Sequence, residues 1–171
     1  VCQEPYESLS PLMHVGEIVG EPLHVHGLAR DAGERSARVR SALDAAGLRP
    51  VDTYINRLPH ELSGGQRQRV AVAAALVLEP KVLLADEPVS MLDVSIRAEI
   101  LNLLAELKQE RGISILFITH DLGTVAAVAD RIAVMYLGRI VETGTVEQIL
   151  RDPKHPYTKA LLSVVPVPNP R

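Results

Sequence analysis

The chain has 171 residues, of which 47% are hydrophobic and 23% charged, and its formal net charge is -3. This is the composition of an ordinary globular domain, and the charge gives no reason to expect a nucleic-acid partner. The longest apolar run, residues 70–78, is less than half of the roughly 20 residues that span a bilayer. Cys2 is the only cysteine, which excludes an internal disulfide and a thiolate zinc cluster.

After a short N-terminal stretch, the chain shows helical periodicity and no strand pattern as far as Pro59. Residues 1–7 read as the end of a strand that turns into a loop. A first helix follows, in which Pro22 is expected to kink or end the helix. Its apolar positions share one face: Val15, Ile18, Val19 and Leu23. A second helix is predicted over 34–46, with Gly47 at its C-terminal end.

Four histidines lie in this helical stretch, and no carboxylate-rich cluster surrounds them: His14, His24, His26 and His60. A spacing of two, as between His24 and His26, does not place side chains on one face of a helix. We therefore expect the four to be surface or structural residues and not metal ligands.

Residues 62–66 read LSGGQ and precede a long apolar run. Ser63 is a good N-cap, so a helix is predicted over 63–78. The first N–H groups of a helix have no partner inside it and suit a phosphate, and the two glycines leave its approach open. The alternative is a Ser-Gly-Gly turn that only leads into a buried helix.

Two short apolar strands are predicted next, over 81–85 and 113–119, with a helix over 94–109 between them. The first strand is of the kind found in the middle of a parallel sheet. Asp86 and Glu87 follow it and His120 follows the second strand, so all three are expected at one sheet edge, where open α/β sheets place their chemistry.

The end of the chain is predicted to contain a short helix, two strands that turn at Gly138, and a helical turn. The ranges of these elements are 124–129, 131–137, 139–142 and 146–150. Prolines are expected to keep the last residues, 164–170, extended.

The order and spacing of four stretches resemble the signature motif, Walker B strand, D-loop and switch histidine of ABC-transporter ATPases: LSGGQ at 62–66, VLLADEP at 82–88, SMLD at 90–93 and THD at 119–121. Residues 8–23, 135–142 and 155–168 are similar to the oligopeptide and dipeptide importers of that family.

The resemblance implies an α/β fold, namely part of a P-loop NTPase: the ABC nucleotide-binding domain with its helical subdomain and the later strands of its parallel sheet. It divides the chain into a Q-loop, a helical subdomain that includes the signature helix, the C-terminal part of the ATPase core, and a C-terminal extension of peptide-importer type. These parts span 1–7, 8–78, 79–145 and 146–171.

Phosphoryl transfer to water needs a metal, a group that orients water, and positive dipoles around the phosphate. Asp86 is expected to hold Mg²⁺ through a water, Glu87 to polarise the attacking water, and His120 to donate to the γ-phosphate. The alternative for Asp86 and Glu87 is a solvated turn. The resemblance adds Gln3 as a ligand of Mg²⁺ and a contact of the water, although a solvated loop amide is the other interpretation.

The resemblance also assigns the ATP-binding face at the signature to four residues: Ser63, Gly64, Gly65 and Gln66. Asp93 would be the D-loop carboxylate that signals to a second subunit, and an N-cap for the following helix is an equally good local account.

The phosphate loop G-x-x-x-x-G-K-[ST] is not found in this sequence, and in the family it precedes the Q-loop. We therefore expect it upstream of Val1. The resemblance implies the ATP-hydrolysing subunit of an importer for oligopeptides or dipeptides, with a second ATPase subunit bound head-to-tail and permease subunits as partners, no nucleic acid, and a place on the cytoplasmic face of the inner membrane. Two alternatives stay open: a soluble ABC ATPase that is not linked to transport, and a non-catalytic remnant.

Overall fold

The computed structural model describes residues 9–163 of the chain. It divides into two compact units, Val1–Ile118 and Thr119–Arg171, and each is described by itself. None of the helices in the described residues is long and apolar enough to cross a membrane. Gln3 and the proline-rich end of the chain lie outside the described residues.

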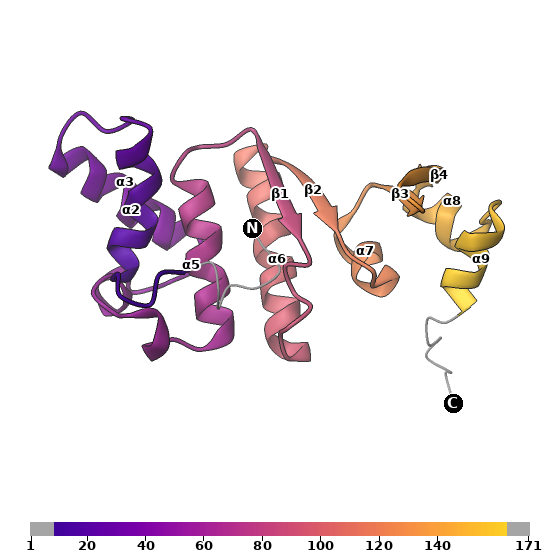
Figure 1. Ribbon diagram of the computed structural model, residues 1–171, viewed down its shortest axis with the longest axis horizontal. Helices are drawn as coiled ribbons and strands as arrows, with labels where there is room; N and C mark the ends of the chain where they lie inside the picture. The colour runs from indigo at the N-terminus through magenta and orange to yellow at the C-terminus, as the bar shows by residue number, and fades with distance from the viewer. Residues whose placement is uncertain (1–8, 164–171) are drawn as a thin grey trace. The chain divides into compact units, whose positions relative to one another are not determined.

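The first unit begins with a group of helices, drawn from indigo to magenta in Figure 1. The structure places no strand between residues 9 and 81, as the sequence predicts. The helices are α2 (Val15–Val25), α3 (Ala32–Ala45), α4 (Val51–Tyr54), the 3₁₀ helix η1 (Pro59–Glu61) and α5 (Gly64–Leu76).

Two helix ends test the local signals in the sequence. Helix α2 continues three residues beyond Pro22, because the proline sits in the last turn, and the Pro22 carbonyl still accepts from the His26 N–H at 3.1 Å. The helix therefore does not end at Pro22, and the other expectation, a kink at this proline, stays a prediction. Helix α3 ends as predicted, with Gly47 at a left-handed φ of 75° just beyond it.

Helix α5 packs against α2, α3 and α6 (Val94–Arg111). Its apolar side chains Val70, Val72 and Leu76 are buried. Two arginines bind carbonyls at helix ends. The Arg38 guanidinium donates to the Val77 carbonyl at 2.9 Å. That of Arg69 donates to the Ala46 carbonyl at 3.0 Å and to Glu99 at 3.1 Å. Arg38 and Arg69 thus bind one carbonyl each at the C-terminal ends of α5 and α3.

Strands β1 (Val82–Asp86) and β2 (Ser114–Ile118) form a parallel pair in which Asp86 lies opposite Ile118. Helix α6 runs alongside them (Figure 1) and ends at Gly112, whose φ is 63°. Leu83 and Ala85 are buried. The opposite face of the pair is exposed along four apolar side chains: Val82, Leu84, Leu116 and Ile118. Within the described residues β1 therefore has a single strand neighbour and does not lie in the middle of a sheet.

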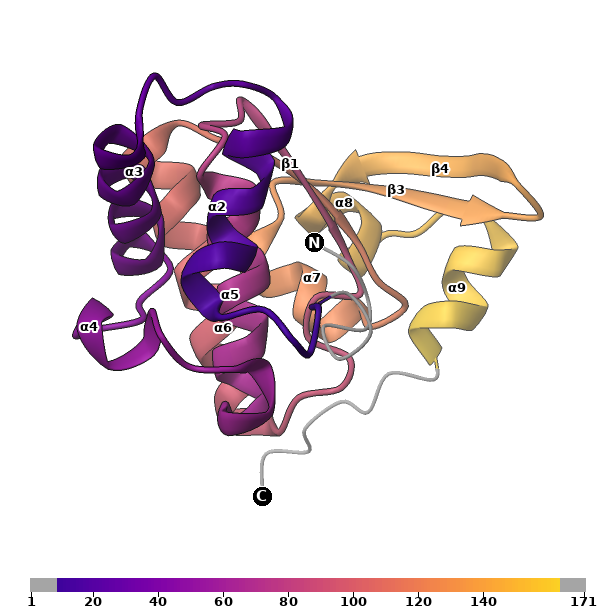
Figure 2. The same ribbon diagram turned by 60° about the vertical axis from the view of Figure 1, so that its left-hand side comes forward.

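The second unit is built on an antiparallel hairpin of β3 (Arg131–Tyr136) and β4 (Arg139–Thr145). Leu137 and Gly138 form its two-residue turn, and both have positive φ. Figure 2 shows this hairpin with α8 (Val146–Arg151) and α9 (Pro156–Ser163) beside it. The buried core consists of Ile132, Val134 and Ile149, with Tyr157 packed against it.

The sequence did not predict helix α9. The carboxylate of Glu142, on β4, accepts hydrogen bonds from the backbone N–H groups of Lys154 at 2.6 Å and His155 at 3.0 Å, just before the helix. The first residue of α9 is Pro156, and proline suits the first position of a helix. Hydrogen bonds to Glu142 on β4 thus fix the segment at which α9 starts.

Candidate functional site

The N-terminus of α5 carries the LSGGQ stretch in the conformation that the sequence predicts. Ser63 is the N-cap, and its hydroxyl accepts from the Gln66 N–H at 3.3 Å. The Gln66 side-chain oxygen accepts in return from the Ser63 N–H at 3.0 Å. This reciprocal pair is a capping box. The Ser63 and Gln66 side chains, both predicted to contact a ligand, therefore shape the helix start in this structure.

Gly65 lies where two helices pack closely, a constraint that the sequence did not indicate. It is buried, and a Cβ built on it would lie 2.5 Å from Cγ2 of Ile96, in the first turns of α6. A side chain at this position would push α5 away from α6. Close packing of two helices thus gives one reason for the absence of a side chain at Gly65. The predicted contact of Gly65 with ATP stays a prediction.

Gln68 was not singled out in the sequence, yet it is only 1% exposed on α5. Its amide nitrogen has no hydrogen-bond partner among the described residues. Buried polar groups in folded proteins are nearly always paired, so this one calls for an explanation. A polar residue at a core position of an amphipathic helix is the sequence signal that could have identified it.

Glu87 directly follows β1 and has an unusual backbone, with φ at 45°. Its N–H donates to the Ile118 carbonyl, at the end of β2, over 2.9 Å. Its carbonyl accepts from the Ser90 hydroxyl at 3.0 Å. Left-handed backbone is rare for residues with a side chain and is found preferentially at functional sites. The conformation of Glu87 therefore favours a functional role over a plain solvated turn.

The stretch from Ser90 to Asp93 connects Glu87 to α6. Leu92 is buried, whereas Met91 and Asp93 are exposed. Asp93 occupies the N-cap position of α6, but its side chain makes no capping hydrogen bond. Asp93 thus takes the N-cap position that the local account expects, without the side-chain hydrogen bond that makes such a cap stabilising.

His120 lies at the start of the second unit, two residues after the end of β2. The next residue, Asp121, is the N-cap of α7 (Leu122–Val128). Its carboxylate accepts from the Gly123 N–H at 2.9 Å and from the Thr124 hydroxyl at 2.7 Å. The side chain of Asp121 thus organises the loop that carries His120, a role that the sequence did not indicate.

The structure brings together some of the predicted residues. Asp86 and Glu87 follow one another at the carboxyl edge of the β1–β2 pair, and Ser90 contacts Glu87 there. Within the first unit, the N-termini of α5 and α6 meet at Gly65 and Ile96. The convergence of His120 and Gln3 on this edge stays a prediction.

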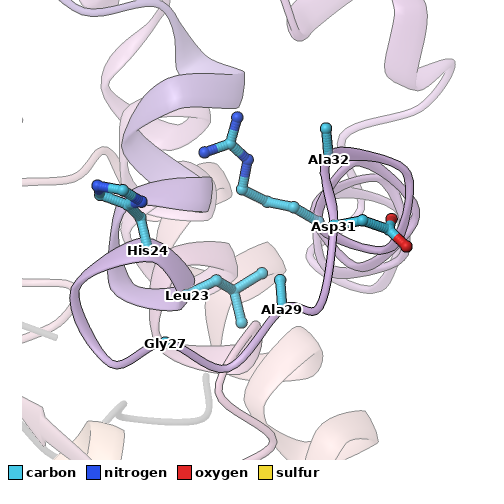
Figure 3. Close-up of a pocket in the computed structure, with 7 residues that line it drawn as sticks. Leu23, His24, Gly27, Ala29, Asp31 and Ala32 are labelled. Atoms are coloured by element: carbon cyan, nitrogen blue, oxygen red, sulfur yellow. The ribbon is translucent and has the colours of Figure 1, made fainter.

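A hollow lies elsewhere, between the end of α2 and the start of α3 (Figure 3), and its volume is about 260 Å³. Leu23, Ala29 and Ala32 line it. The His24 ring and the Asp31 carboxylate point away from each other (Figure 3). Asp31 is engaged as the N-cap of α3, where it accepts from the Glu34 N–H at 2.8 Å. No group of three or more metal-ligating side chains occurs in the described residues.

A family model described as "ABC transporter" matches residues 1–90, and one described as "Oligopeptide/dipeptide transporter, C-terminal region" matches residues 141–171. The first match covers more than half of the chain. The chain therefore belongs to the ABC transporter family, and its resemblance to the peptide importers of that family is confirmed.

Curated relatives agree with this assignment. The oligopeptide transport ATP-binding protein OppF of Bacillus subtilis is 48% identical over 99% of this chain and 55% of its own length. OppF of Escherichia coli is 49% identical over 99% of this chain and 50% of its own length. A peptide import ATP-binding protein of Brucella ovis is 52% identical, with 53% of it covered. The chain spans about half the length of these relatives.

Solved structures show the same fold. A dimeric ATP-binding cassette, MJ0796, in a post-hydrolysis state with ADP and phosphate, has a TM-score of 0.70 and 33% identity, covering 85% of this chain and 61% of the other. The protein cbiO1 from Clostridium perfringens, part of an ABC transporter complex, has a TM-score of 0.76 and 34% identity, covering 88% and 57%. The predicted α/β fold, part of an ABC nucleotide-binding domain, is confirmed.

Proposed function

We propose that this chain is the C-terminal part of the ATP-binding and ATP-hydrolysing subunit of an ABC importer for oligopeptides or dipeptides. The observation that carries the proposal is the left-handed Glu87 at the carboxyl edge of the β1–β2 pair, directly after Asp86. The peptide class rests on the relatives, whose names describe oligopeptide or peptide import.

The residues at this edge fit the chemistry of phosphoryl transfer. Asp86 is an exposed carboxylate, the kind of ligand that Mg²⁺ takes singly or in pairs beside phosphate oxygens. Bound there, Mg²⁺ would neutralise charge on the phosphates. Glu87 would orient and polarise the attacking water, and His120 would donate a hydrogen bond to the γ-phosphate. Gln3 would reach the same metal and water from the Q-loop.

The start of α5 would serve a nucleotide held by a second subunit. Its capping box leaves the N–H groups of Gly64 and Gly65 at the beginning of the helix, where the helix dipole favours an anion. Asp93 is exposed at the start of α6 and would contact that second subunit. We infer a head-to-tail dimer of ATPase subunits bound to permease subunits, on the cytoplasmic face of the inner membrane.

The four-part division of the chain belongs to the same proposal: Q-loop 1–7, helical subdomain 8–78, ATPase core 79–145 and extension 146–171. The main competitor is a soluble ABC ATPase without a transport role, and the match over residues 141–171 to a peptide-transporter region speaks against it. The other competitor is a non-catalytic remnant, which would need no left-handed carboxylate after β1.

The test uses the longer protein that contains a phosphate loop. Glu87→Gln is expected to keep ATP binding and to lower hydrolysis by about 10³-fold or more, because the amide loses the charge that orients water. Asp86→Asn should instead weaken the dependence on Mg²⁺. Hydrolysis by Glu87→Gln within a few-fold of the parent would contradict the role of Glu87. Peptide uptake into vesicles carrying the whole complex separates the importer from a soluble ATPase.

The 171-residue chain alone provides a second test. It lacks the G-x-x-x-x-G-K-[ST] sequence, whose N–H groups and lysine supply most contacts to the β- and γ-phosphates. We expect isothermal titration to detect weak binding of Mg-ATP or none. Micromolar affinity would mean that the nucleotide contacts are wrongly assigned.

A further inference from the structure

The backbone of Glu87 differs from the other left-handed positions that carry a side chain. Among the described residues these are Glu79, Glu87 and Leu137. Glu79 lies just beyond the end of α5, and Leu137 lies in the β3–β4 turn, two places where such a backbone is common. Glu87 lies at the end of a parallel strand, so neither a helix end nor a hairpin explains it.

Three hydrogen bonds hold the peptide groups on either side of the Glu87 Cα atom. The Glu87 N–H donates to the Ile118 carbonyl, which any residue at position 118 would offer. The Glu87 carbonyl accepts from the Ser90 hydroxyl at 3.0 Å and also from the Ser90 N–H at 3.4 Å. The hydroxyl bond is the shorter of the two contacts from Ser90, and it depends on the identity of the side chain.

The surroundings of Ser90 make this hydroxyl a fixed donor. Pro88 and Val89, between the two residues, are both buried, and so is Leu92. These side chains anchor the turn on both sides of Ser90, whose own hydrogen bond to Glu87 is half-buried. A hydrogen bond shielded from water in this way is harder to replace by solvent than an exposed one.

We propose that Ser90 is a positioning residue for Glu87: its hydroxyl holds the Glu87 carbonyl and keeps the carboxylate-bearing residue in the left-handed conformation at the sheet edge. This inference rests on the proposed function, in which Glu87 orients the attacking water. A rotation of the Glu87 backbone would carry its carboxylate away from that water, and misplacement by about 1 Å can lower a rate by about 10²-fold.

The experiment compares Ser90→Ala with Ser90→Thr in the longer protein, using steady-state ATP hydrolysis. Ser90→Ala should lower kcat by about tenfold to 10²-fold, with KM for ATP changed less than about threefold, because the loss concerns the reacting geometry. Ser90→Thr keeps a hydroxyl and should restore most of kcat. Ser95→Ala, the same exchange at an exposed position of α6, is the matched control and should leave kcat within about twofold.

Two results would overturn the proposal. One is a Ser90→Ala protein with the kcat of the parent. The other is a Ser90→Thr protein as impaired as Ser90→Ala, since the hydroxyl would then not be the group that matters. In a Glu87→Gln background, Ser90→Ala should lower the residual rate much less, because the two residues act as a unit.

Thermal unfolding separates this proposal from the proposed function, because it needs no catalysis. Glycine adopts positive φ freely, so Glu87→Gly removes the need for a restraint at this position. Ser90→Ala should lower the melting temperature more in the parent than in the Glu87→Gly variant. Equal losses in the two backgrounds would show that Ser90 does not hold the backbone, even if Glu87 proves catalytic. A larger loss of melting temperature in the parent than in the Glu87→Gly variant would support the restraint. If Glu87→Gln still hydrolysed ATP, the same result would stand while the catalytic role of Glu87 was refuted.

Discussion

The helical part of the first unit and the β1–β2 pair differ in how completely each covers its own apolar surface. Leu43 of α3 and Leu23 of α2 are 0% exposed, and the arginines between the helices bind the carbonyls at their ends. On the strand pair, Leu84 is 50% and Leu116 59% exposed. Parallel sheets are normally covered on both faces. The proposed catalytic edge thus belongs to the less completely covered of the two regions.

The helical group carries its own restraints, whereas the restraints seen on the strand pair lie at the edge that holds the functional residues. The restraints on Glu87 come from Ile118 and Ser90, both at that edge. Matched substitutions in the two regions therefore test this difference directly.

The largest expected effect contrasts one leucine from each region. Leu43→Ala should destabilise the first unit by about 2–5 kcal/mol, because it leaves a cavity among packed helices. Leu84→Ala should change stability by about 1 kcal/mol or less, because its side chain is half exposed. Chemical denaturation of this chain measures both. Similar losses for the two variants would mean that the exposed face of the strand pair is covered in solution.

The second-largest effect on stability is expected at the contact between α5 and α6. Gly65→Ala should destabilise the chain by about 1–3 kcal/mol, because the new Cβ would meet Ile96. Adding Ile96→Ala removes the opposing methyl groups and should recover part of the loss. If the stability loss of the double variant equals or exceeds the sum of the two single losses, Gly65 is not needed for the close contact with Ile96.

Arg69 of α5 binds both the end of α3 and a side chain of α6, so its replacement tests how much these hydrogen bonds stabilise the helices. Arg69→Met should cost about 1–3 kcal/mol, because the Ala46 carbonyl and Glu99 both lose a donor. Arg40→Met removes an ion pair to Asp52 that is exposed on both sides, and should cost about 1 kcal/mol or less. If Arg40→Met lost as much stability as Arg69→Met, surface charge and not the hydrogen bond at the helix end would explain both losses.

Gln68 gives a smaller effect, which is expected to be favourable. Gln68→Met keeps the length of the side chain and removes an amide nitrogen that has no partner in the described residues. Replacing such a group by an apolar one of similar shape is nearly neutral or stabilising, by about 1 kcal/mol at most. A clear loss of stability on denaturation of this chain would show that the amide is paired in solution.

The smallest effect is a pH dependence at the start of α2. The N–H of His14 and then its ring hold the pKa of Glu17 below the usual value of 4.5. A lowered pKa in the folded state stabilises above pH 4.5, and this contribution is lost as the pH falls through the lowered pKa. Glu17→Gln should therefore flatten the stability profile below pH 4.5. Glu21→Gln on the same helix is the control, and an identical profile for both variants would contradict the prediction.

Local patterns in the sequence were enough to identify the family, the order of the motifs and most element boundaries. Ser63 as an N-cap, Gly47 and Gly112 at helix ends, and Asp86 at the end of β1 all follow from residues within a few positions of one another. Caps, periodicity and turn residues act locally, so they can be read without knowing what packs against them.

Contacts between distant segments, in contrast, are seen only in the folded chain. Gly65 meets Ile96 across two helices, Glu87 is held by a carbonyl of the second strand, and the segment before α9 is fixed by Glu142. Each contact joins segments that no short-range pattern relates. Close approach and left-handed strain arise from packing between elements, and packing is settled only when the elements have been placed against one another.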